Sequence, residues 1–286
     1  MVSVSLGLRY MLLSALGFAL MAVCVKLSFA EGIPLLEIVA ARALVSIFLS
    51  YLDVKRKNIP IWGENRPLLF ARGLVGALSL ICVYYAVITM PLAEATVIQY
   101  LHPAFAALLA FLFLGEHLKK ATFVSILLSF VGILLVARPV FLFGLSDATL
   151  PTLSVIMAVL GAFGSAIAYV LVRRLSQTED SSVIIFYFPL VALPIAVLGL
   201  GDQFVMPSGI GWLYLLLVGI FTQVGQIGLT KAMQTETAAR ATAFSYTQVV
   251  FSALLGWWVF AEEPALNVYV GAALIILGAY INTFKK

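Results

Sequence analysis

The sequence contains one apolar stretch of membrane-spanning length that occurs twice. Residues 93–116 read AEATVIQYLHPAFAALLAFLFLGE, and residues 239–262, which lie 146 positions later, read ARATAFSYTQVVFSALLGWWVFAE. At this offset, twelve of the forty positions from 93 to 132 carry the same residue. The matches include Thr, Tyr, Phe, Glu and Gly, which an apolar composition alone does not readily supply. The chain is therefore predicted to consist of two copies of one unit, with a functional site where the copies meet.

The composition excludes a soluble globular protein. Hydrophobic residues make up 63% of the chain and charged residues 10%, whereas a soluble domain is about half apolar and about a quarter charged. Cys24 and Cys82 both lie inside long apolar runs, so neither a disulfide nor a metal site is expected. The first run, Leu8 to Phe29, is too long for the core of a signal peptide and is expected to remain as a helix.

Ten segments of the chain are predicted to be membrane-spanning helices. In lipid the backbone must satisfy its own hydrogen bonds, so apolar runs of this length form helices rather than open strands. Proline and glycine residues interrupt the runs at several boundaries. The predicted helices cover residues 8–29, 34–52, 67–89, 92–114, 121–137, 152–172, 182–200, 209–230, 238–260 and 265–284. The predicted fold class is an all-α membrane protein with ten transmembrane helices.

The basic residues support this count because they alternate with the helices. With the N-terminus inside, thirteen Lys and Arg residues fall in inner segments, and two, Lys26 and Arg138, fall at the outer side. Cytoplasmic loops of membrane proteins carry such an excess of Lys and Arg. We therefore expect a multi-pass protein with both termini in the cytoplasm. A bacterial inner membrane is the expected location, with an organelle membrane as the alternative.

Each half is predicted to contain an odd number of helices, and this number determines how the second copy is oriented in the membrane. Five helices per half place the second copy upside down relative to the first. Gly17 and Gly164 match between the first helices of the halves at an offset of 147, and Gly73 and Gly219 match between the third helices at 146. Inverted repeats of this kind occur in transporters, with the substrate site near the membrane midplane between the halves. The two repeats are expected to cover residues 5–138 and 151–285.

Two long motifs resemble the EamA family of the drug/metabolite transporter superfamily. They are RGLVGALSLICVYYAVITMPLAEATVIQYLHPAFAALLAFLFLGEHL at 72–118 and ATAFSYTQVVFSALLGWWVFAEEP at 241–264, and Arg42 also fits the family pattern. The resemblance implies ten helices, a central cavity and secondary transport of small metabolites, often as an exporter. Residues 72–118 look most like family members that carry amino-acid-like or S-adenosylmethionine-like solutes.

The two motifs differ from each other at the centre of the repeated helix. Leu101 and His102 stand where the second half has Thr247 and Gln248, and Pro103 has no proline partner. The two half-sites are therefore not expected to be chemically equivalent.

Polar side chains within the predicted helices form stripes at helical spacing. Unpaired polar groups are costly in hydrocarbon, so these side chains are expected to face a cavity or each other. The predicted substrate-binding residues are Tyr84, Thr96, Gln99, Tyr100, Tyr169, Gln223, Gln226, Thr242, Ser245 and Tyr246. The alternative is that these residues only hold the helices together through interhelical hydrogen bonds.

Ionisable residues also lie within the predicted helices. His102 is close to the midplane and is a candidate for binding a coupling proton. Its alternative role is a neutral histidine bonded to a carbonyl that Pro103 leaves free. Pro103 is predicted to kink the fourth helix and act as a hinge. Arg42 is a candidate for binding an anion or a substrate carboxylate, with a structural contact to another helix as the alternative. Arg72 is expected to snorkel to the inner surface.

Several other residues receive structural interpretations. Glu94 is expected to pair with Lys26 at the outer mouth, and Glu116 and Glu262 are expected to fix loop geometry at opposite surfaces. Small residues on the fifth and tenth helices favour close packing within one molecule, with dimerisation as the alternative. They are Ser125, Ser129, Gly132, Gly271 and Gly278.

The sequence carries no enzyme signature. It lacks a glycine-rich phosphate loop with its lysine, so no catalytic residue, cofactor or metal is expected, and the net charge of +4 does not indicate nucleic-acid binding. The predicted function is secondary transport of a small organic metabolite by rocking one repeat against the other. Its partners would be the solute, the bilayer and a coupling ion, in a monomer or weak homodimer. The alternatives are a non-transporting scaffold or receptor, or a membrane-embedded enzyme.

Overall fold

The described part of the chain is helical throughout. The computed structural model describes residues 6–102, 104–106, 108–109, 120–137, 150–235, 245 and 247–284, and no strand occurs among them. The helices are α1 (Leu6–Ala30), α2 (Leu35–Lys57), α3 (Arg66–Thr89), α4 (Leu92–Gln99), α6 (Lys120–Ala137), α8 (Thr152–Leu175), α9 (Ser181–Leu200), α10 (Ile210–Thr235), α12 (Thr247–Phe260) and α13 (Leu266–Phe284). The all-helical fold predicted from the sequence is confirmed.

Six of these helices are long and apolar enough to cross a membrane: α1, α2, α3, α8, α9 and α10. Two shorter apolar segments, Thr247–Phe260 and Leu266–Gly278, follow them in the described part of the chain. Large apolar side chains such as Phe48, Leu198 and Trp258 remain exposed on the helices, as expected for surfaces that face lipid rather than water. The count of ten membrane-spanning helices stays a prediction.

The predicted fourth helix, 92–114, is interrupted. α4 ends at Gln99, and Tyr100 and Leu101 form a turn before the chain becomes helical again at His102. A proline four residues after Gln99 has no N–H to bond the Gln99 carbonyl, and its ring clashes with that carbonyl. The sequence predicted a kink here, and the structure shows a break one turn before the proline. Pro103 itself, the predicted hinge, lies outside the described residues.

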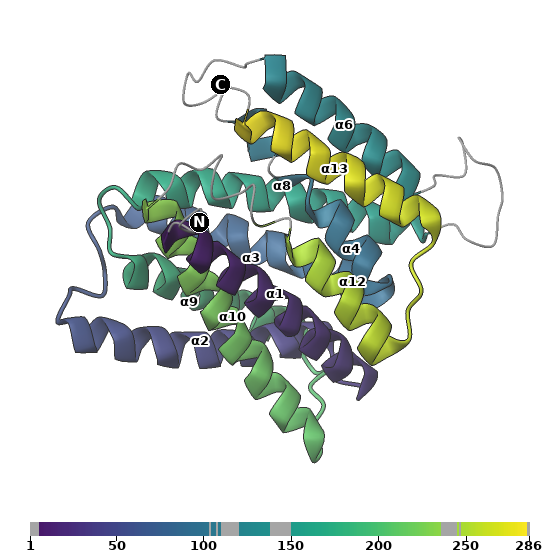
Figure 1. Ribbon diagram of the computed structural model, residues 1–286. Coiled ribbons are helices and arrows are strands. Elements are labelled where there is room, and N and C mark those ends of the chain that lie inside the picture. The colour runs from purple at the N-terminus through teal and green to yellow at the C-terminus, as the bar shows by residue number, and fades with distance from the viewer. Residues whose placement is uncertain are drawn as a thin grey trace.

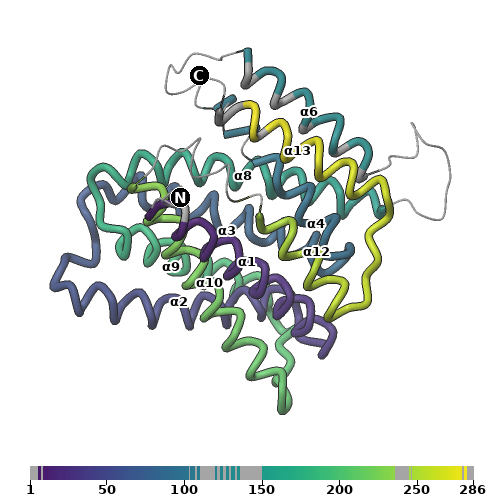
Figure 2. Tube along the Cα trace, viewed as in Figure 1, coloured from purple at the N-terminus to yellow at the C-terminus, as the bar shows by residue number. Residues whose placement is uncertain are grey.

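The main helix pairs each join the first half of the chain to the second. α1 packs along α10, α3 along α8, α2 along α9, and α6 along α13. Figure 1 shows α6 and α13 side by side at one edge, and the Cα trace in Figure 2 shows α1 crossing α10 near the chain's N-terminus. Contacts between helices of the same half are fewer. Among the described residues, the most extensive helix packing is therefore between the halves rather than within either half.

Small residues bring the backbones of α1 and α10 close together. A Cβ atom added at Gly17 would lie 2.9 Å from the Gly225 nitrogen and 3.1 Å from the Phe221 carbonyl oxygen. The Ser14 hydroxyl donates a hydrogen bond of 2.7 Å to the Gly225 carbonyl. Close backbone approach through small residues, with a hydroxyl bonded across the interface, is a common way to join helices in lipid.

The α3–α8 pair makes the same kind of contact, again with the serine in the first half and the accepting carbonyl in the second. The Ser79 hydroxyl donates a hydrogen bond of 2.7 Å to the Gly161 carbonyl, and a Cβ atom at Gly164 would lie 2.8 Å from the Ser79 Cβ. Gly161 stands 147 positions after Ser14, and Gly225 stands 146 positions after Ser79. The serine and the glycine have therefore changed places between two otherwise equivalent interfaces.

Small residues also join α6 to α13. A Cβ atom at Gly132 would lie 2.7 Å from the Gly271 carbonyl oxygen. This contact agrees with the prediction that these glycines serve packing within one molecule. Nothing is described of the Ser125 and Ser129 side chains.

The loops at one end of the bundle are tied together by charged groups. Asp180 caps α9 by accepting a hydrogen bond of 2.8 Å from the Ser182 N–H, and Lys57 Nζ lies 2.9 Å from Asp180 Oδ1. The Ser182 hydroxyl also donates to Asp53. Glu179 accepts hydrogen bonds from the backbone N–H groups of Glu64 and Asn65. The loop before α3 and the loop before α9 are thereby fixed to each other.

Replacing Gly17 with isoleucine is expected to destabilise the protein by about 1–3 kcal/mol, the usual cost of overpacking. The larger side chain would push α1 away from α10 and break the Ser14–Gly225 hydrogen bond. The thermal unfolding midpoint of the purified protein measures the effect. Leu16→Ile, at a neighbouring side chain that is 39% exposed, is the control and should leave the midpoint unchanged. Equal midpoints for the two variants would contradict the close approach.

Replacing Asp180 with asparagine is expected to lower stability at neutral pH. Partial burial acts to raise the pKa of the Asp180 carboxyl, but hydrogen bonds from Ser182 and the charge of Lys57 outweigh it and hold the pKa below its ordinary value. A carboxyl with a lowered pKa stabilises the fold above its unfolded pKa of about 3.9. That stabilisation is lost as the pH falls through the folded pKa.

The loss in Asp180→Asn should be about 0.5–1 kcal/mol at pH 7, because asparagine still caps a helix and the half-exposed ion pair is weak. The difference between variant and parent should shrink as the pH falls below 4. Unfolding midpoints measured between pH 3 and pH 8 test this expectation. Asp202→Asn, at an exposed loop position, is the control, and a pH-independent difference for Asp180→Asn would contradict the assignment.

Candidate functional site

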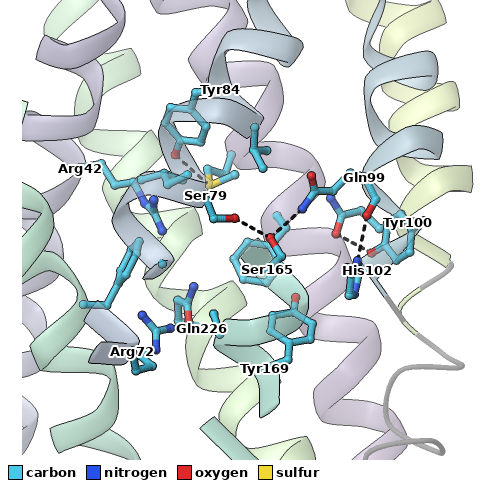
Figure 3. A pocket seen from close by; sticks show the side chains of 18 residues that line it. Arg42, Arg72, Ser79, Tyr84, Gln99, Tyr100, His102, Ser165, Tyr169 and Gln226 are labelled. Atoms are coloured by element: carbon cyan, nitrogen blue, oxygen red, sulfur yellow. Dashed lines mark hydrogen bonds between the residues drawn. The ribbon is translucent and has the colours of Figure 1, made fainter. Parts of the chain in front are cut away.

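A cavity of about 120 Å³ lies between the two halves of the chain. Eight of the helices and the segment after α4 line it, and Figure 3 shows side chains from both halves pointing into it. Its lining residues are Phe18, Met21, Arg42, Arg72, Gly76, Ser79, Leu80, Val83, Tyr84, Gln99, Tyr100, His102, Ser165, Ala168, Tyr169, Phe188, Gln226 and Gln248. The predicted site residues that the structure brings together here are Arg42, Tyr84, Gln99, Tyr100, His102, Tyr169 and Gln226.

One wall of the cavity is a chain of hydrogen bonds between α4, α8 and α3. The Gln99 amide Nε2 donates to the Ser165 hydroxyl at 3.0 Å, and the Ser165 and Ser79 hydroxyls are 2.9 Å apart. Because the Ser79 proton is already donated to the Gly161 carbonyl, Ser165 must donate to Ser79. The direction of every bond is thus fixed, and the Gln99 Oε1 atom is left buried without a partner among the described residues.

The break after α4 turns two ring side chains toward the cavity. The Tyr100 hydroxyl donates to Gln248 Oε1 at 2.8 Å, which joins this segment to α12. The His102 ring packs edge-on against Tyr169, with ring centroids 4.8 Å apart. His102 Nδ1 lies 3.0 Å from the Gln99 carbonyl oxygen. A carbonyl can only accept, so Nδ1 carries the proton of a neutral ring and Nε2 is a free acceptor.

Two arginines form the opposite wall. The Arg42 and Arg72 side chains are 3% and 4% exposed, and their guanidinium carbons lie 4.9 Å and 4.6 Å from the centre of the Phe188 ring. Arg42 Nε donates to the Thr222 hydroxyl at 2.9 Å, and Arg72 Nη2 reaches Gln226 Oε1 at 3.4 Å. Cation–π contacts of this kind partly compensate for lost hydration.

The position of Arg72 corrects the expectation that it snorkels to the inner surface. Its guanidinium is buried against Phe188 and lines the cavity. The depth of Arg72 along α3 could be predicted from the sequence, but the direction in which the helix turns its side chain could not. Gly76, one turn later, leaves room for the side chain, because a Cβ there would lie 3.0 Å from Arg72 Nη1.

Other predicted site residues do not reach the cavity. The Thr96 hydroxyl donates to the Leu92 carbonyl within its own helix at 2.7 Å, and Gln223 Nε2 donates to the Ser50 hydroxyl at 2.9 Å. Both therefore follow the alternative interpretation of bonding within and between helices. Ser245 is buried but is not among the lining residues. Thr242 and Tyr246 lie outside the described residues.

Several contributors to the cavity were missed by the sequence interpretation, among them Ser79, Phe188 and Gln248. Ser79 was absent from the predicted site because a lone serine in an apolar helix gives little signal. Phe188 was overlooked for the similar reason that it lies in a continuous apolar run. Gln248 was noted as a departure from the first half but was not assigned a role, although its offset from His102 could have identified it.

Comparisons with known proteins identify the family of this chain. The model of the EamA-like transporter family matches residues 5–138 and again residues 152–284. The chain belongs to this family. The pseudopaline exporter CntI of Pseudomonas aeruginosa is 30% identical over 98% of this chain and 97% of its own length. Solute carrier family 35 member G1 of Mus musculus is 29% identical over 98% of this chain and 79% of its own length.

A solved crystal structure shares the fold of this EamA-like protein. It covers 95% of this chain and 96% of its own, with a TM-score of 0.68 and 20% sequence identity. Because the relatives include an exporter and a solute carrier, and the family is one of transporters, the protein is an integral membrane transporter that handles a small-molecule solute. The expectation that it is not an enzyme is confirmed.

Metal-binding chemistry has no basis in the part of this transporter that the structure describes. No group of three or more His, Cys, Asp or Glu residues is placed to hold a metal ion there. Cys24 and Cys82 are free thiols, as the sequence indicated. The cavity offers guanidinium donors, neutral acceptors and aromatic rings, which suit reversible binding of a solute.

At the end of the bundle where α3 ends and α4 begins, an ion pair closes the space beside the cavity. Lys26 of α1 pairs with Glu262 just after α12 and also donates to the Met90 carbonyl at 3.2 Å. The second Glu262 oxygen accepts a hydrogen bond of 2.7 Å from the Leu92 N–H at the start of α4. Lys26 therefore pairs with Glu262 rather than with the expected Glu94.

The backbone around Glu262 is shaped for this contact. Ala261 has a φ of 52°, a left-handed conformation that costs a residue with a Cβ on the order of 1–2 kcal/mol. A Cβ added at Gly256 would lie 2.8 Å from Glu262 Oε2, so glycine makes room for the carboxylate. The Glu262 contact fixes the geometry of this end, in agreement with the role expected for it from sequence. Glu116, its counterpart in the repeat, lies outside the described residues.

Glu262→Gln is expected to destabilise this transporter by about 1.5–3 kcal/mol, the usual value of a hydrogen bond to a charged group. The change leaves the Lys26 ammonium half-buried without its counter-charge. Combining Glu262→Gln with Lys26→Met should add less than the sum of the two single losses, because both remove the same pair. Unfolding midpoints of the purified variants give the comparison. The neighbouring exposed Glu263→Gln is the control, and additive losses would contradict the pairing.

Proposed function

We propose that this protein is a secondary transporter that moves a small organic metabolite through the cavity by alternating access. Its ten transmembrane helices would form two inverted repeats, residues 5–138 and 151–285, in a bacterial inner membrane with both termini in the cytoplasm. The solute would be of the amino-acid-like or S-adenosylmethionine-like kind. A coupling ion or solute exchange would supply the driving force, and the working unit would be a monomer or weak homodimer.

The observation that carries this proposal is a polar cavity at the seam between the halves. Its lining contains buried polar atoms without partners among the described residues, on Arg42, Arg72, Gln99 and His102. A scaffold or receptor would be expected to pair these atoms with one another, since unpaired polar groups are costly away from water. A solute that enters the cavity would pair them instead.

The size of the cavity supports a conformational change during transport. Sites for organic ligands are commonly about 300–1000 Å³, and this cavity is about 120 Å³. A metabolite would therefore need the surrounding helices to separate. Two features would allow this separation, because each joins helices that border the cavity. The chain would flex at the break at Tyr100–Leu101, and the Lys26–Glu262 contact would open.

His102 is proposed to bind the solute rather than to carry a proton alone. Its Nδ1–H is bonded to the Gln99 carbonyl, the alternative foreseen from the sequence, and its Nε2 faces the cavity as an acceptor. A proton arriving at Nε2 would place a third positive charge in the cavity that Arg42 and Arg72 also line. Coupling to protons through this residue would then depend on an anionic solute being present.

Transport by the purified protein in liposomes tests the proposal. Radiolabelled amino acids and S-adenosylmethionine would be offered to preloaded and empty vesicles, and saturable counterflow of at least one solute is expected. Gln226→Ala removes a cavity side chain and should lower transport about tenfold or more, since a polar contact to a charged group is worth about 1.5–3 kcal/mol.

The matched control is Gln223→Ala, one turn earlier on the same helix and bonded to Ser50 away from the cavity. It should keep the transport rate per folded molecule. If no solute crosses or binds, the transporter assignment loses its support. If Gln223→Ala and Gln226→Ala lower transport equally, the cavity is not the site.

A further inference from the structure

We propose that the transported solute carries an oxyanion group, such as a carboxylate, at one end and an N–H or O–H donor at the other. The oxyanion would be held by Arg42 and Arg72, and the donor by Gln99 and His102. This inference rests on the proposed function and names the substrate class of the same site. It follows from which atoms of the cavity are already bonded and which are not.

The wall of the cavity that Arg42 and Arg72 form carries positive charge, and no described carboxylate balances it. Arg42 Nη1, Arg72 Nε and Arg72 Nη1 are buried and have no hydrogen-bond partner among the described residues. Among the described residues, no Asp or Glu lines the cavity, and no carboxylate lies within salt-bridge distance of either guanidinium. Glu37, the acidic residue nearest in sequence on α2, accepts a hydrogen bond from the Val205 N–H instead.

An uncompensated pair of buried cations needs an anion. Removing a charge from water is costly unless a counter-charge and hydrogen bonds replace the lost hydration. The shared Phe188 ring contributes only its quadrupole, and it holds both guanidinium groups near one another. Planar guanidinium groups bind carboxylate and phosphate through paired N–H donors. The N–H groups of Arg72 Nε, Arg72 Nη1 and Arg42 Nη1 have no partner among the described residues and are available to such an anion.

The acceptor end of the cavity lacks a donor. Gln99 Nε2 is committed to Ser165 and His102 Nδ1 to the Gln99 carbonyl, which leaves Gln99 Oε1 and His102 Nε2 as buried acceptors without partners among the described residues. Figure 3 places Gln99 and His102 on the side of the cavity opposite Arg42 and Arg72. An amino or hydroxy group separated from a carboxylate by the width of the cavity would satisfy both ends at once.

The arrangement distinguishes between the two solute kinds considered above. An amino acid or hydroxy acid offers a carboxylate to the arginines and a donor to Gln99 and His102. A solute with net positive charge, such as S-adenosylmethionine, brings a further cation toward two unpaired guanidinium groups. We therefore infer that net anionic amino or hydroxy acids are preferred over S-adenosylmethionine.

Ligand-induced stabilisation of the purified protein tests the inference without requiring transport. The probes are L-malate, L-aspartate, succinate, inorganic phosphate and S-adenosylmethionine, with sodium chloride as the baseline at constant ionic strength. L-Malate or L-aspartate should raise the unfolding midpoint in a saturable manner. Succinate, which has the same carboxylates but lacks the hydroxyl or ammonium donor, should bind about tenfold more weakly, the effect of one lost hydrogen bond.

The arginine variants separate substrate binding from a structural role. Arg42→Gln and Arg72→Gln should each weaken malate or aspartate binding by about tenfold to a hundredfold. Without ligand they should unfold at the same temperature as the parent or higher, because each removes an uncompensated buried charge. Arg56→Gln is the control, since Arg56 is exposed and pairs with Asp53 at the bundle surface. It should leave ligand binding unchanged.

Each contrary result has a defined meaning. A response to phosphate alone would overturn an organic solute in favour of a free inorganic anion. A response to S-adenosylmethionine but to no anion would overturn the anionic class while leaving the transporter proposal intact. No response to any anion would also overturn it, whatever the liposome assay shows. A large drop in the unfolding temperature of ligand-free Arg42→Gln and Arg72→Gln would assign both arginines a structural role.

Discussion

The structure depends on the need to pair every polar group in a region without water. Most polar side chains within the helices meet this need locally or across a helix pair. Ser14 and Ser79 bond carbonyls of the facing helix, Thr96 bonds its own helix, and Gln223 bonds Ser50. Some buried polar atoms have no partner among the described residues: those on Arg42, Arg72, Gln99 and His102 line the cavity, whereas others, such as Gln223 Oε1 and Ser252 Oγ, lie elsewhere.

Much of the fold could be predicted from the sequence because apolar runs and their breaks have a direct physical cause. Most of the described helices begin and end near the predicted residues, although α4 already ends at Gln99. The carbonyl freed by Pro103 is the one that His102 binds. The rotation of each helix about its axis could not be read in the same way. Arg72 and Gln223 show this limit, since one was expected at the surface and lies in the cavity, while the other was expected in the cavity and lies between helices.

The α1–α10 and α3–α8 interfaces are alike in how closely their backbones approach, but the side chains next to them differ. This difference gives the cavity its two unlike walls. Gly17 and Gly164 occupy matching places in the α1–α10 and α3–α8 interfaces. The neighbouring positions have diverged, with Phe18 in the first half and Ser165 in the second, and both line the cavity. The cavity therefore lies between two equivalent helix interfaces but is lined by different side chains on each side. Such a cavity can bind a solute with two different ends in one orientation.

The repeat in the sequence also relates a basic residue near the end of α1 to a basic residue near the end of α8. Lys26 donates to the Met90 carbonyl at 3.2 Å, and Arg173, 147 positions later, donates to the Met233 carbonyl at 3.2 Å. Each cation therefore rests on a carbonyl near the end of the third helix of its own half, at opposite ends of the bundle. Under alternating access, a solute is released only when one end opens while the other stays closed. If transport proceeds by alternating access as proposed, Lys26 and Arg173 would lie at the two ends that open in turn, and each would hold a carbonyl near the end of the third helix of its own half.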